Sequence, residues 1–325
     1  MSRDGDRSWF STGCRLLDEV LGGGLLLGRI SNVCGLESSG KTLLAAEAAT
    51  NFLKAFPDGQ VVYNETEAAF DRDYMRSLGI PVDEFTFLFD CDTVEEFFDD
   101  ITSRLDRQDR PLLYVLDSLD ALSTDAEDKE RGKGSKGLFS GYRMEKQRAL
   151  SAALRHLCRL LERSRSHLMI VSQVREDVLA SAYSSVKQYR RSGGKALDFY
   201  SSQILWLYNV GREERQVAGI KRAYAFRIRA RCRKNKVGSP FRECQFFIRV
   251  GYGIDDVWTH LEFLDGVDRL DEFEPGASVR KLVDRFHRHM SPEEKRSFRS
   301  RLDDFVSSVW REIEDKFSVG TGKYG

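Results

Sequence analysis

The sequence of 325 residues has no apolar run approaching the roughly 18 residues that a membrane-spanning helix needs. Its first seven residues are polar and lack the apolar centre of a signal peptide. The six cysteines form no CxxC pair, and several stand in apolar runs, where cysteine behaves as a small hydrophobic residue. We therefore expect a cytoplasmic protein with reduced cysteines and no membrane partner.

The chain also has no net charge, because 51 lysines and arginines balance 51 aspartates and glutamates. Any binding of nucleic acid must then come from local clusters of cations and not from a global basic field. Hydrophobic residues make up 41% and charged residues 31% of the chain, which is typical of ordinary soluble proteins. This composition suits one large α/β domain with a small appendage.

Short apolar runs of the strand type alternate with longer segments of helical periodicity. These runs are 61–63, 85–89, 112–116, 168–171 and 204–207. The alternation predicts an α/β fold with a mostly parallel sheet and flanking helices. Two later runs, 224–234 and 243–250, are predicted to extend the sheet in the antiparallel direction.

The character of the sequence changes near residue 265, which suggests a core at 1–264 and a small helical region at 265–325. Ser291, a following proline and Glu294 form the N-cap and capping-box pattern of a helix start. Apolar residues then recur at steps of three and four from Phe298 to Phe317. This helix must bury one face.

The segment 35–42 reads Gly-Leu-Glu-Ser-Ser-Gly-Lys-Thr and lies between an apolar run and a helical pattern. Glycines let backbone amides point at phosphate oxygens, while the lysine reaches the outer phosphates and the threonine hydroxyl ligates Mg²⁺. We therefore expect a nucleoside triphosphate with Mg²⁺ at this loop. The predicted nucleotide-binding residues here are Gly35, Glu37, Ser38, Ser39, Gly40, Lys41, Thr42 and Leu43.

A second acidic site is expected at the end of a neighbouring strand. Asp117 ends the apolar run 112–116 and is the predicted metal ligand beside Thr42. The general base for the attacking water is expected at another strand end, where Glu65 and Glu67 are both candidates. Their spacing alone does not choose between them.

Several motifs together resemble the RecA family of recombinases. They are Ser11-Thr12-Gly13, Leu17-Asp18, Gly28-Arg29-Ile30, the phosphate loop with its internal Glu-Ser-Ser, and Gly193-Gly194-Lys195-Ala196-Leu197. The resemblance extends from about Ser11 to Gly253. It implies a RecA-like phosphate-loop ATPase that binds ATP and Mg²⁺, polymerises on single-stranded DNA as a helical filament, and pairs it with homologous double-stranded DNA.

The resemblance also assigns roles around the nucleotide. In the family a glutamate just before an Ala-Leu-Asp segment activates water, and the similar segment 67–71 selects Glu67 here, with Glu65 supporting the site. Asp71 and Tyr74 would contact the adenine, and the alternative for Tyr74 is a plain core residue.

Two further catalytic positions come from the resemblance. Gln173 falls where the family has a glutamine that senses the γ-phosphate, although Ser172 replaces an asparagine beside it. Lys234 and Lys236 match a Lys-Asn-Lys motif whose lysines reach the ATP of the neighbouring subunit, where cations neutralise charge on the transferred phosphoryl group. The alternative is a solvated basic turn.

Two polar loops, at about 125–147 and 176–194, would contact DNA by resemblance, since cations and aromatic groups suit single-stranded DNA. The predicted DNA-binding residues are Arg148, Ser151, Arg155, Arg175, Lys187, Arg190, Arg191, Gly193, Gly194 and Lys195. Lys195 replaces an asparagine of the family and Asp177 a basic residue, so affinity for DNA is expected to differ. The alternative is that these loops are simply solvated.

One part of the family pattern is not recognised before Ser11. RecA carries an N-terminal helix and strand that dock on the adjacent subunit, whereas about ten residues precede Ser11 here. Segment 313–322 is similar to the end of that helix and its glycine turn. One hypothesis is that 265–325 is the oligomerisation module, with the 298–317 face on a neighbouring protomer; the alternative is a helix packed on its own core.

Two other function classes remain. One is an accessory RecA-like DNA-binding ATPase without strand exchange, and the other is a hexameric motor of the helicase or clock-ATPase kind. The Lys-Asn-Lys and Gly-Gly-Lys-Ala-Leu segments disfavour the motor. A recombinase would act at the nucleoid, or in the host cytoplasm if it is encoded by a phage.

Overall fold

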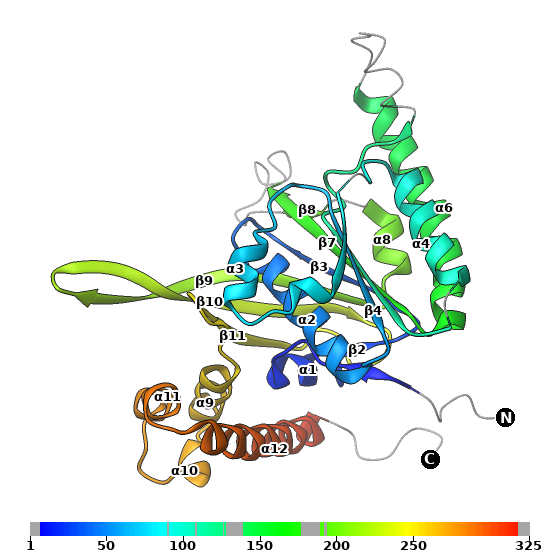
Figure 1. Cartoon of the computed structure of the whole chain (residues 1–325). Helices are drawn as coiled ribbons and strands as arrows, with labels where there is room; N and C mark the ends of the chain where they lie inside the picture. The colour runs from blue at the N-terminus through cyan, green and yellow to red at the C-terminus, as the bar shows by residue number, and fades with distance from the viewer. Residues whose placement is uncertain are drawn as a thin grey trace, which may run out of the picture.

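The computed structural model describes residues 7–89, 91–107, 109–125, 127, 139–176, 189–191 and 194–317. In these residues one large twisted sheet carries helices on both faces, and a group of helices lies beside one end of it (Figure 1). The predicted α/β fold class is confirmed. None of the helices in the described ranges has the length and apolar character that crossing a membrane requires.

The main sheet has the strand order β12-β11-β10-β9-β3-β7-β6-β4-β5. The parallel part consists of β3 (Arg29–Gly35), β4 (Gln60–Glu65), β5 (Phe85–Leu88), β6 (Leu112–Asp117), β7 (His167–Glu176) and β9 (Gln203–Val217). The antiparallel part adds β10 (Ile220–Asn235), β11 (Glu243–Arg249) and β12 (Gly253–Ile254). Both predictions, a parallel centre and an antiparallel extension, are confirmed.

The register of the parallel strands determines where the polar residues meet. Glu65 lies opposite Asp117, and Gly35 lies opposite Gln173. The carboxyl ends of four strands thus share one edge of the sheet, which is where ligands bind in open α/β sheets.

The two faces of the sheet are covered by different helices. One face packs on α1 (Arg15–Leu21) and α2 (Lys41–Ala55), and the other on α4 (Val94–Arg107), α6 (Phe139–Ser164) and α8 (Gly194–Tyr200). Side chains alternate along a strand, so Val115 of β6 joins the α2 side while Tyr114 and Leu116 join the α4 and α6 side. The predicted helical spacing from 148 to 161 forms the buried stripe of α6.

Smaller elements complete the core. They are β1 (Trp9–Phe10), β2 (Leu25–Leu26), α3 (Arg72–Ser77), the 3₁₀ turn Val82–Glu84 and β8 (Tyr189–Arg191). β8 pairs with the end of β7, so a short antiparallel ribbon occupies part of the second predicted loop.

β9 and β10 continue past the sheet as a two-stranded arm (Figure 1). The predicted runs 204–207 and 224–234 cover only the parts of β9 and β10 that lie in or next to the main sheet. Residues 214–222 of the arm are all exposed, and many of them are charged. At its tip Val217 and Ile220 are 65% and 58% exposed.

Four helices follow the sheet: α9 (Asp256–Gly266), α10 (Leu270–Phe273), α11 (Val279–Arg288) and α12 (Pro292–Phe317). The predicted capping box at the start of α12 is confirmed. The Ser291 backbone N–H donates to Glu294 Oε2 at 2.7 Å, and the Glu294 N–H donates to Ser291 Oγ at 3.2 Å. Two otherwise unpaired helix donors are satisfied in this way.

The apolar face of α12 is buried against its own chain. Leu302, Val306 and Val309 are fully buried and Phe298 nearly so, in one cluster with α1, α9 and β11. The expected packing of this part of the face on a neighbouring protomer is therefore wrong. Its apolar stripe meets apolar residues of the same core, and from Phe298 to Phe317 the largely exposed member of the stripe is Phe317.

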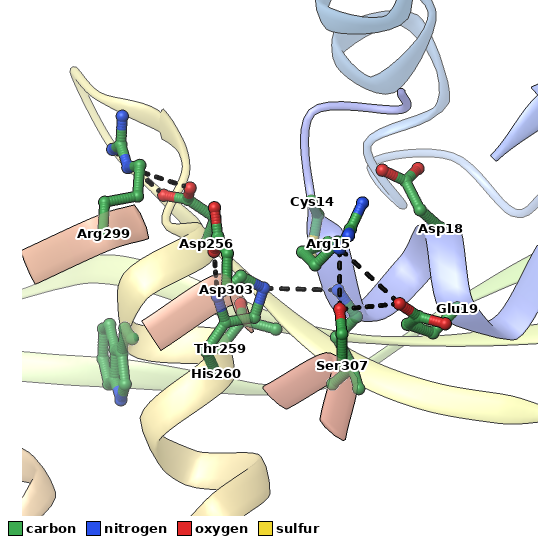
Figure 2. Close-up of polar contacts among 12 residues, drawn as sticks. Cys14, Arg15, Asp18, Glu19, Asp256, Thr259, His260, Arg299, Asp303 and Ser307 are labelled. Atoms are coloured by element: carbon green, nitrogen blue, oxygen red, sulfur yellow. Dashed lines mark hydrogen bonds and ion pairs between the residues drawn. The ribbon is translucent and has the colours of Figure 1, made fainter. Parts of the chain in front are cut away.

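Polar contacts fasten α12 to α1 and α9 (Figure 2). Arg15 Nε donates to Ser307 Oγ at 2.8 Å, and Ser307 donates to Glu19 Oε1 at 2.7 Å. His260 of α9 accepts a hydrogen bond from the Leu16 N–H at 3.2 Å, and its Nδ1 lies 3.1 Å from Asp303 Oδ1 of α12. The start of α1 is thus tied to two of the four C-terminal helices, α9 and α12.

Candidate active site

The loop between β3 and α2 has the backbone shape that its glycines allow. Gly40 is the N-cap of α2 with φ 84°, a left-handed conformation that disfavours side chains. A Cβ on Gly35 would lie 2.5 Å from the Leu207 carbonyl oxygen, and one on Gly40 would overlap the Ile248 side chain. Both positions therefore require glycine. Glu37 and Ser38 are exposed on this loop.

Lys41, the first residue of α2, folds back over the loop. Its Nζ and the Ser39 hydroxyl both donate to the Leu36 carbonyl oxygen at 2.8 Å. Burial lowers the pKa of Lys41, while the carboxylates of Asp117 and Glu67 oppose that shift. The ammonium thus lies among acidic groups at the N-terminus of a helix, with Leu43 buried behind it.

Asp117, at the end of β6, is held by two hydroxyl groups. Tyr63 donates to Asp117 Oδ2 at 2.8 Å, and Thr42 is hydrogen-bonded to the same carboxylate. Burial raises the pKa of Asp117 to about 6, and these two hydrogen bonds oppose the shift. Near pH 7 the group is an anion beside a hydroxyl, a set of hard oxygen donors that fits Mg²⁺.

Glu65 and Glu67, the two candidates for the general base, have different hydrogen-bond partners. Glu65 is buried, and its Oε1 accepts from the N–H groups of Glu67 and Ala69, both at 3.1 Å. Glu67 instead accepts from the hydroxyl of Ser118 and from Gln173 Nε2 at 3.0 and 3.2 Å. Glu65 therefore shapes the loop, and Glu67 presents its carboxylate to the site.

Asp71 and Tyr74 lie together at the start of α3. Asp71 is the N-cap, and its Oδ1 accepts from the Tyr74 N–H at 2.9 Å. The Tyr74 side chain is 44% exposed. The alternative in which Tyr74 is a core residue is therefore wrong, and its ring is free to stack on a planar ligand.

Lys234 and Lys236 lie far from the phosphate loop of their own chain. Lys234 Nζ donates to the carbonyl oxygens of Asp198 and Phe199, and Lys236 Nζ donates to that of Phe199 at 2.9 Å. Both cations therefore sit at the C-terminal end of α8, which favours positive charge. The Lys236 N–H bonds the Ser202 carbonyl, at the opposite end of the strands from Gly35. Neither lysine belongs to the nucleotide site of its own chain.

Arg148, Ser151 and Arg155 lie on one face of α6, since they are three and four residues apart. Arg148 and Arg155 are exposed, and Arg155 Nε donates to the Tyr200 hydroxyl at 3.2 Å. A Cβ on Gly194 would lie 3.4 Å from the Gln147 side chain. The end of the second loop thus lies beside Gln147 in the first half of α6, with Lys195 exposed next to it.

The remaining predicted DNA-binding residues are only partly described. Arg175 pairs with Arg190 and Val174 with Arg191 in the β7–β8 ribbon, which places three arginines along one two-stranded element. Their side chains, together with Lys187, Gly193 and most of the first loop, lie outside the described residues.

Sequence reasoning missed three residues that touch this site: Tyr63, Ser118 and Asp120. Ser118 directly follows Asp117, so the Asp-Ser pair at a strand end was an available signal. Tyr63 lies two residues before Glu65 on the face that also carries Asp117, but this becomes apparent only once β4 and β6 are in register. Asp120 Oδ2 accepts the Gln173 N–H at 2.7 Å, across 53 residues of sequence.

Comparison with known proteins agrees with this arrangement. Residues 2–255 match the sequence model of the RecA N-terminal domain. The chain belongs to the RecA family. Protein RecA of Streptomyces venezuelae is 33% identical over 325 residues, covering 98% of this chain and 80% of that protein. Protein RecA of Streptomyces ambofaciens is 33% identical with 98% and 82% covered, and that of Leifsonia xyli is 33% identical with 95% and 81% covered.

Family membership makes this RecA homologue an ATP-dependent recombinase and a DNA-dependent ATPase. The alternative of an accessory ATPase without strand exchange is not favoured by these relatives. The phosphate loop, Asp117 and Glu67 meet at one edge of the sheet, as an ATPase of this class requires.

Proposed function

We propose that this RecA homologue binds ATP and Mg²⁺ between adjacent protomers, polymerises on single-stranded DNA as a helical filament, and pairs that strand with homologous double-stranded DNA. The observation that most directly supports the proposal is the pair of hydrogen bonds from Gln173 to Glu67. Gln173 stands on β7, the strand that leads into the second DNA loop, and Glu67 is the proposed base for water. A change in the loop on DNA binding would therefore reach the ATPase site directly.

The residues divide the chemistry among them. The phosphate loop and Lys41 bind and orient the triphosphate, and Glu67 accepts a proton from the attacking water. Thr42 and Asp117 would hold Mg²⁺, which neutralises charge on the phosphates when it is bound. Tyr74 would stack on the adenine, with Asp71 beside it.

Lys234 and Lys236 would act on the nucleotide of the next protomer. They lie at the opposite end of the strands from the phosphate loop of their own chain. They are also anchored by α8, the helix that follows the second DNA loop. Cations at that position would stabilise charge that develops on the transferred phosphoryl group.

The proposed DNA-binding surface follows the middle of α6, the β7–β8 ribbon and the start of α8. Its residues are Arg148, Ser151, Arg155, Arg175, Lys187, Arg190, Arg191, Gly193, Gly194 and Lys195. A protein with these partners would act in the cytoplasm, at DNA. The division into a core at 1–264 and a helical region at 265–325 belongs to the same proposal, with the end of α12 at the exposed Phe317 as the tie to a neighbouring protomer.

The test measures ATP hydrolysis with and without single-stranded DNA, together with electron microscopy of samples that contain a slowly hydrolysed ATP analogue. Strong stimulation by DNA and open helical filaments are expected. Lys41→Ala should abolish ATP binding and filament formation together. Closed rings would support a hexameric motor, and ATP binding without stimulation or filaments would support an accessory protein; either result would overturn the proposal.

A further inference from the structure

The turn that follows Asp117 is a junction between the ATPase site and both DNA-facing segments. It comprises residues 118–122, between the end of β6 and the first polar loop. On one side the Ser118 hydroxyl donates to Glu67. On the other, Asp120 and the carbonyl groups of the turn are bound by β7 and α6. A displacement of the turn therefore moves a hydrogen-bond partner of the proposed base.

Lys146 of α6 holds this turn by its backbone. Its Nζ donates to the carbonyl oxygens of Leu119 at 3.2 Å, Asp120 at 3.4 Å and, at closer range, Leu122. An ammonium group has three donors, and three carbonyl oxygens of one turn receive them. Hydrogen bonds from a charged donor are about twice as strong as neutral ones. The turn and the first half of α6 are thus fastened together.

The neighbours of Lys146 on α6 face in different directions. Leu150, one helical turn later, is buried in the core, whereas Arg148 is exposed on the proposed DNA-binding face. Lys146 itself is half-buried. A DNA backbone bound at Arg148 would therefore contact the same helix, two residues from the ammonium group that holds the turn.

Asp120 connects the same turn to the second DNA segment. Its Oδ2 accepts the backbone N–H of Gln173 at 2.7 Å, and the Leu119 N–H donates to the Val171 carbonyl oxygen at 3.0 Å. Gln173 in turn donates to both oxygens of Glu67. The Asp120 charge also contributes to the electrostatic environment of Lys41. Hydrogen bonds from the turn therefore help to position the second half of β7, in addition to its pairing with neighbouring strands.

We infer that Lys146 and Asp120 are positioning residues that transmit the binding of single-stranded DNA to Glu67. Neither is placed to touch the nucleotide phosphates or to transfer a proton, since both act through the turn 118–122. The inference rests on the proposed function, because it requires that DNA binds along α6 and the β7–β8 ribbon. It adds the route by which that binding accelerates hydrolysis.

The experiment compares Lys146→Met with Lys54→Met, which removes an exposed lysine in the last turn of α2, away from the proposed DNA-binding face of α6. Methionine keeps an unbranched stem and has no N–H donor. The quantities measured are kcat and KM for ATP, with and without saturating oligonucleotide, and the affinity for a labelled single strand in the presence of a slowly hydrolysed ATP analogue. Lys54→Met should match the unmodified protein in all of them.

For Lys146→Met we expect the DNA-free rate, the KM for ATP and the DNA affinity to stay within about twofold. The stimulation of kcat by saturating DNA should fall at least about fivefold, the lower end of typical coupling between two sites. Undiminished stimulation would overturn the inference. The inference would also be overturned if DNA affinity fell and the stimulation of kcat returned at a higher DNA concentration, because Lys146 would then be a DNA contact.

A second pair of variants keeps the test independent of Lys146. Asp120→Ala removes the acceptor for the Gln173 N–H and should reduce stimulation, whereas Asp120→Asn keeps an acceptor oxygen and should restore most of it. In the double variant Lys146→Met/Asp120→Ala, stimulation should fall no further than in the worse single variant, since both act through one turn. Independent, multiplicative losses would contradict a shared route.

The two levels of failure are distinguishable. If hydrolysis by the unmodified protein does not respond to DNA, the proposed function fails and this inference fails with it. If DNA stimulates hydrolysis by the unmodified protein, and stimulates Lys146→Met and Asp120→Ala to the same extent, only the inference is overturned.

Discussion

The side-chain amide of Gln173 donates hydrogen bonds to both carboxylate oxygens of Glu67, at 3.0 and 3.2 Å. The two residues are 106 positions apart in the chain. Gln173 lies in the second half of β7, and Glu67 lies just after the end of β4. A planar amide that spans a carboxylate fixes its orientation and competes with water for its lone pairs. The proposed base is therefore controlled by a residue on the strand that leads to DNA.

The first prediction concerns Glu67 itself. Glu67→Gln keeps the size of the side chain but cannot accept a proton, so hydrolysis should fall by about 10²–10⁴-fold, the usual contribution of a general base. ATP binding should be retained, and filaments formed with ATP should persist. Rapid-quench measurement of hydrolysis and a filter assay of nucleotide binding would check both. Normal hydrolysis by this variant would show that the base is a different residue.

The second prediction concerns Tyr63, whose buried hydroxyl donates to Asp117 Oδ2. Tyr63→Phe removes that bond and should raise the Mg²⁺ concentration needed for half-maximal nucleotide binding by roughly 10–100-fold, the usual effect of losing a support to a metal ligand. Titration of a fluorescent nucleotide measures this without reference to turnover. Tyr114→Phe is the matched control, since Tyr114 lies on the other face of the sheet and bonds Asp100. Equal Mg²⁺ dependence of both variants would exclude the role of Tyr63.

The third prediction separates stability from assembly in α12. Leu302 is fully buried, so Leu302→Ala should lower the free energy of unfolding by about 2–5 kcal/mol. Phe317 is 83% exposed, so Phe317→Ala should leave stability within about 0.5 kcal/mol. If the end of the chain ties protomers together, Phe317→Ala, alone or with residues 318–325 removed, should nevertheless weaken filament formation. Denaturant unfolding and light scattering on DNA measure the two effects, and unimpaired filaments would locate the tie elsewhere.

The fourth prediction is a pH dependence of folding stability from Glu47 of α2. Its Oε1 accepts the Ile254 N–H at 2.7 Å, and burial raises the pKa of the carboxyl to about 8 from an ordinary 4.5. The unfolded chain releases this proton first, so the contribution of Glu47 to stability decreases as the pH rises from about 4.5 to about 8.

Glu47→Gln imitates the protonated form and keeps an acceptor for the Ile254 N–H. Its melting temperature should therefore exceed that of the unmodified protein at pH 8 to 9, and the difference should vanish near pH 5, a window that follows from the pKa of about 8. Melting curves at both pH values test this. A difference that does not change with pH would show that Glu47 does not titrate in this range.

The sequence by itself determined the features that depend on contiguous residues. The phosphate loop, the strand end at Asp117, the alternation of strands and helices, and the capping box at Ser291 are all local patterns. Each reflects a backbone geometry or hydrogen bond formed within a few residues, so the spacing of residue types is sufficient to predict it.

The tertiary structure alone decided which distant residues meet. The register of β4 against β6 brings Tyr63 to Asp117, the packing of α6 brings Lys146 to the turn 118–122, and the burial of α12 shows that its apolar face belongs to its own core. Periodicity shows that a face must be buried but does not show against what. Those partners depend on how strands and helices align across tens to hundreds of residues, and no local pattern records that alignment.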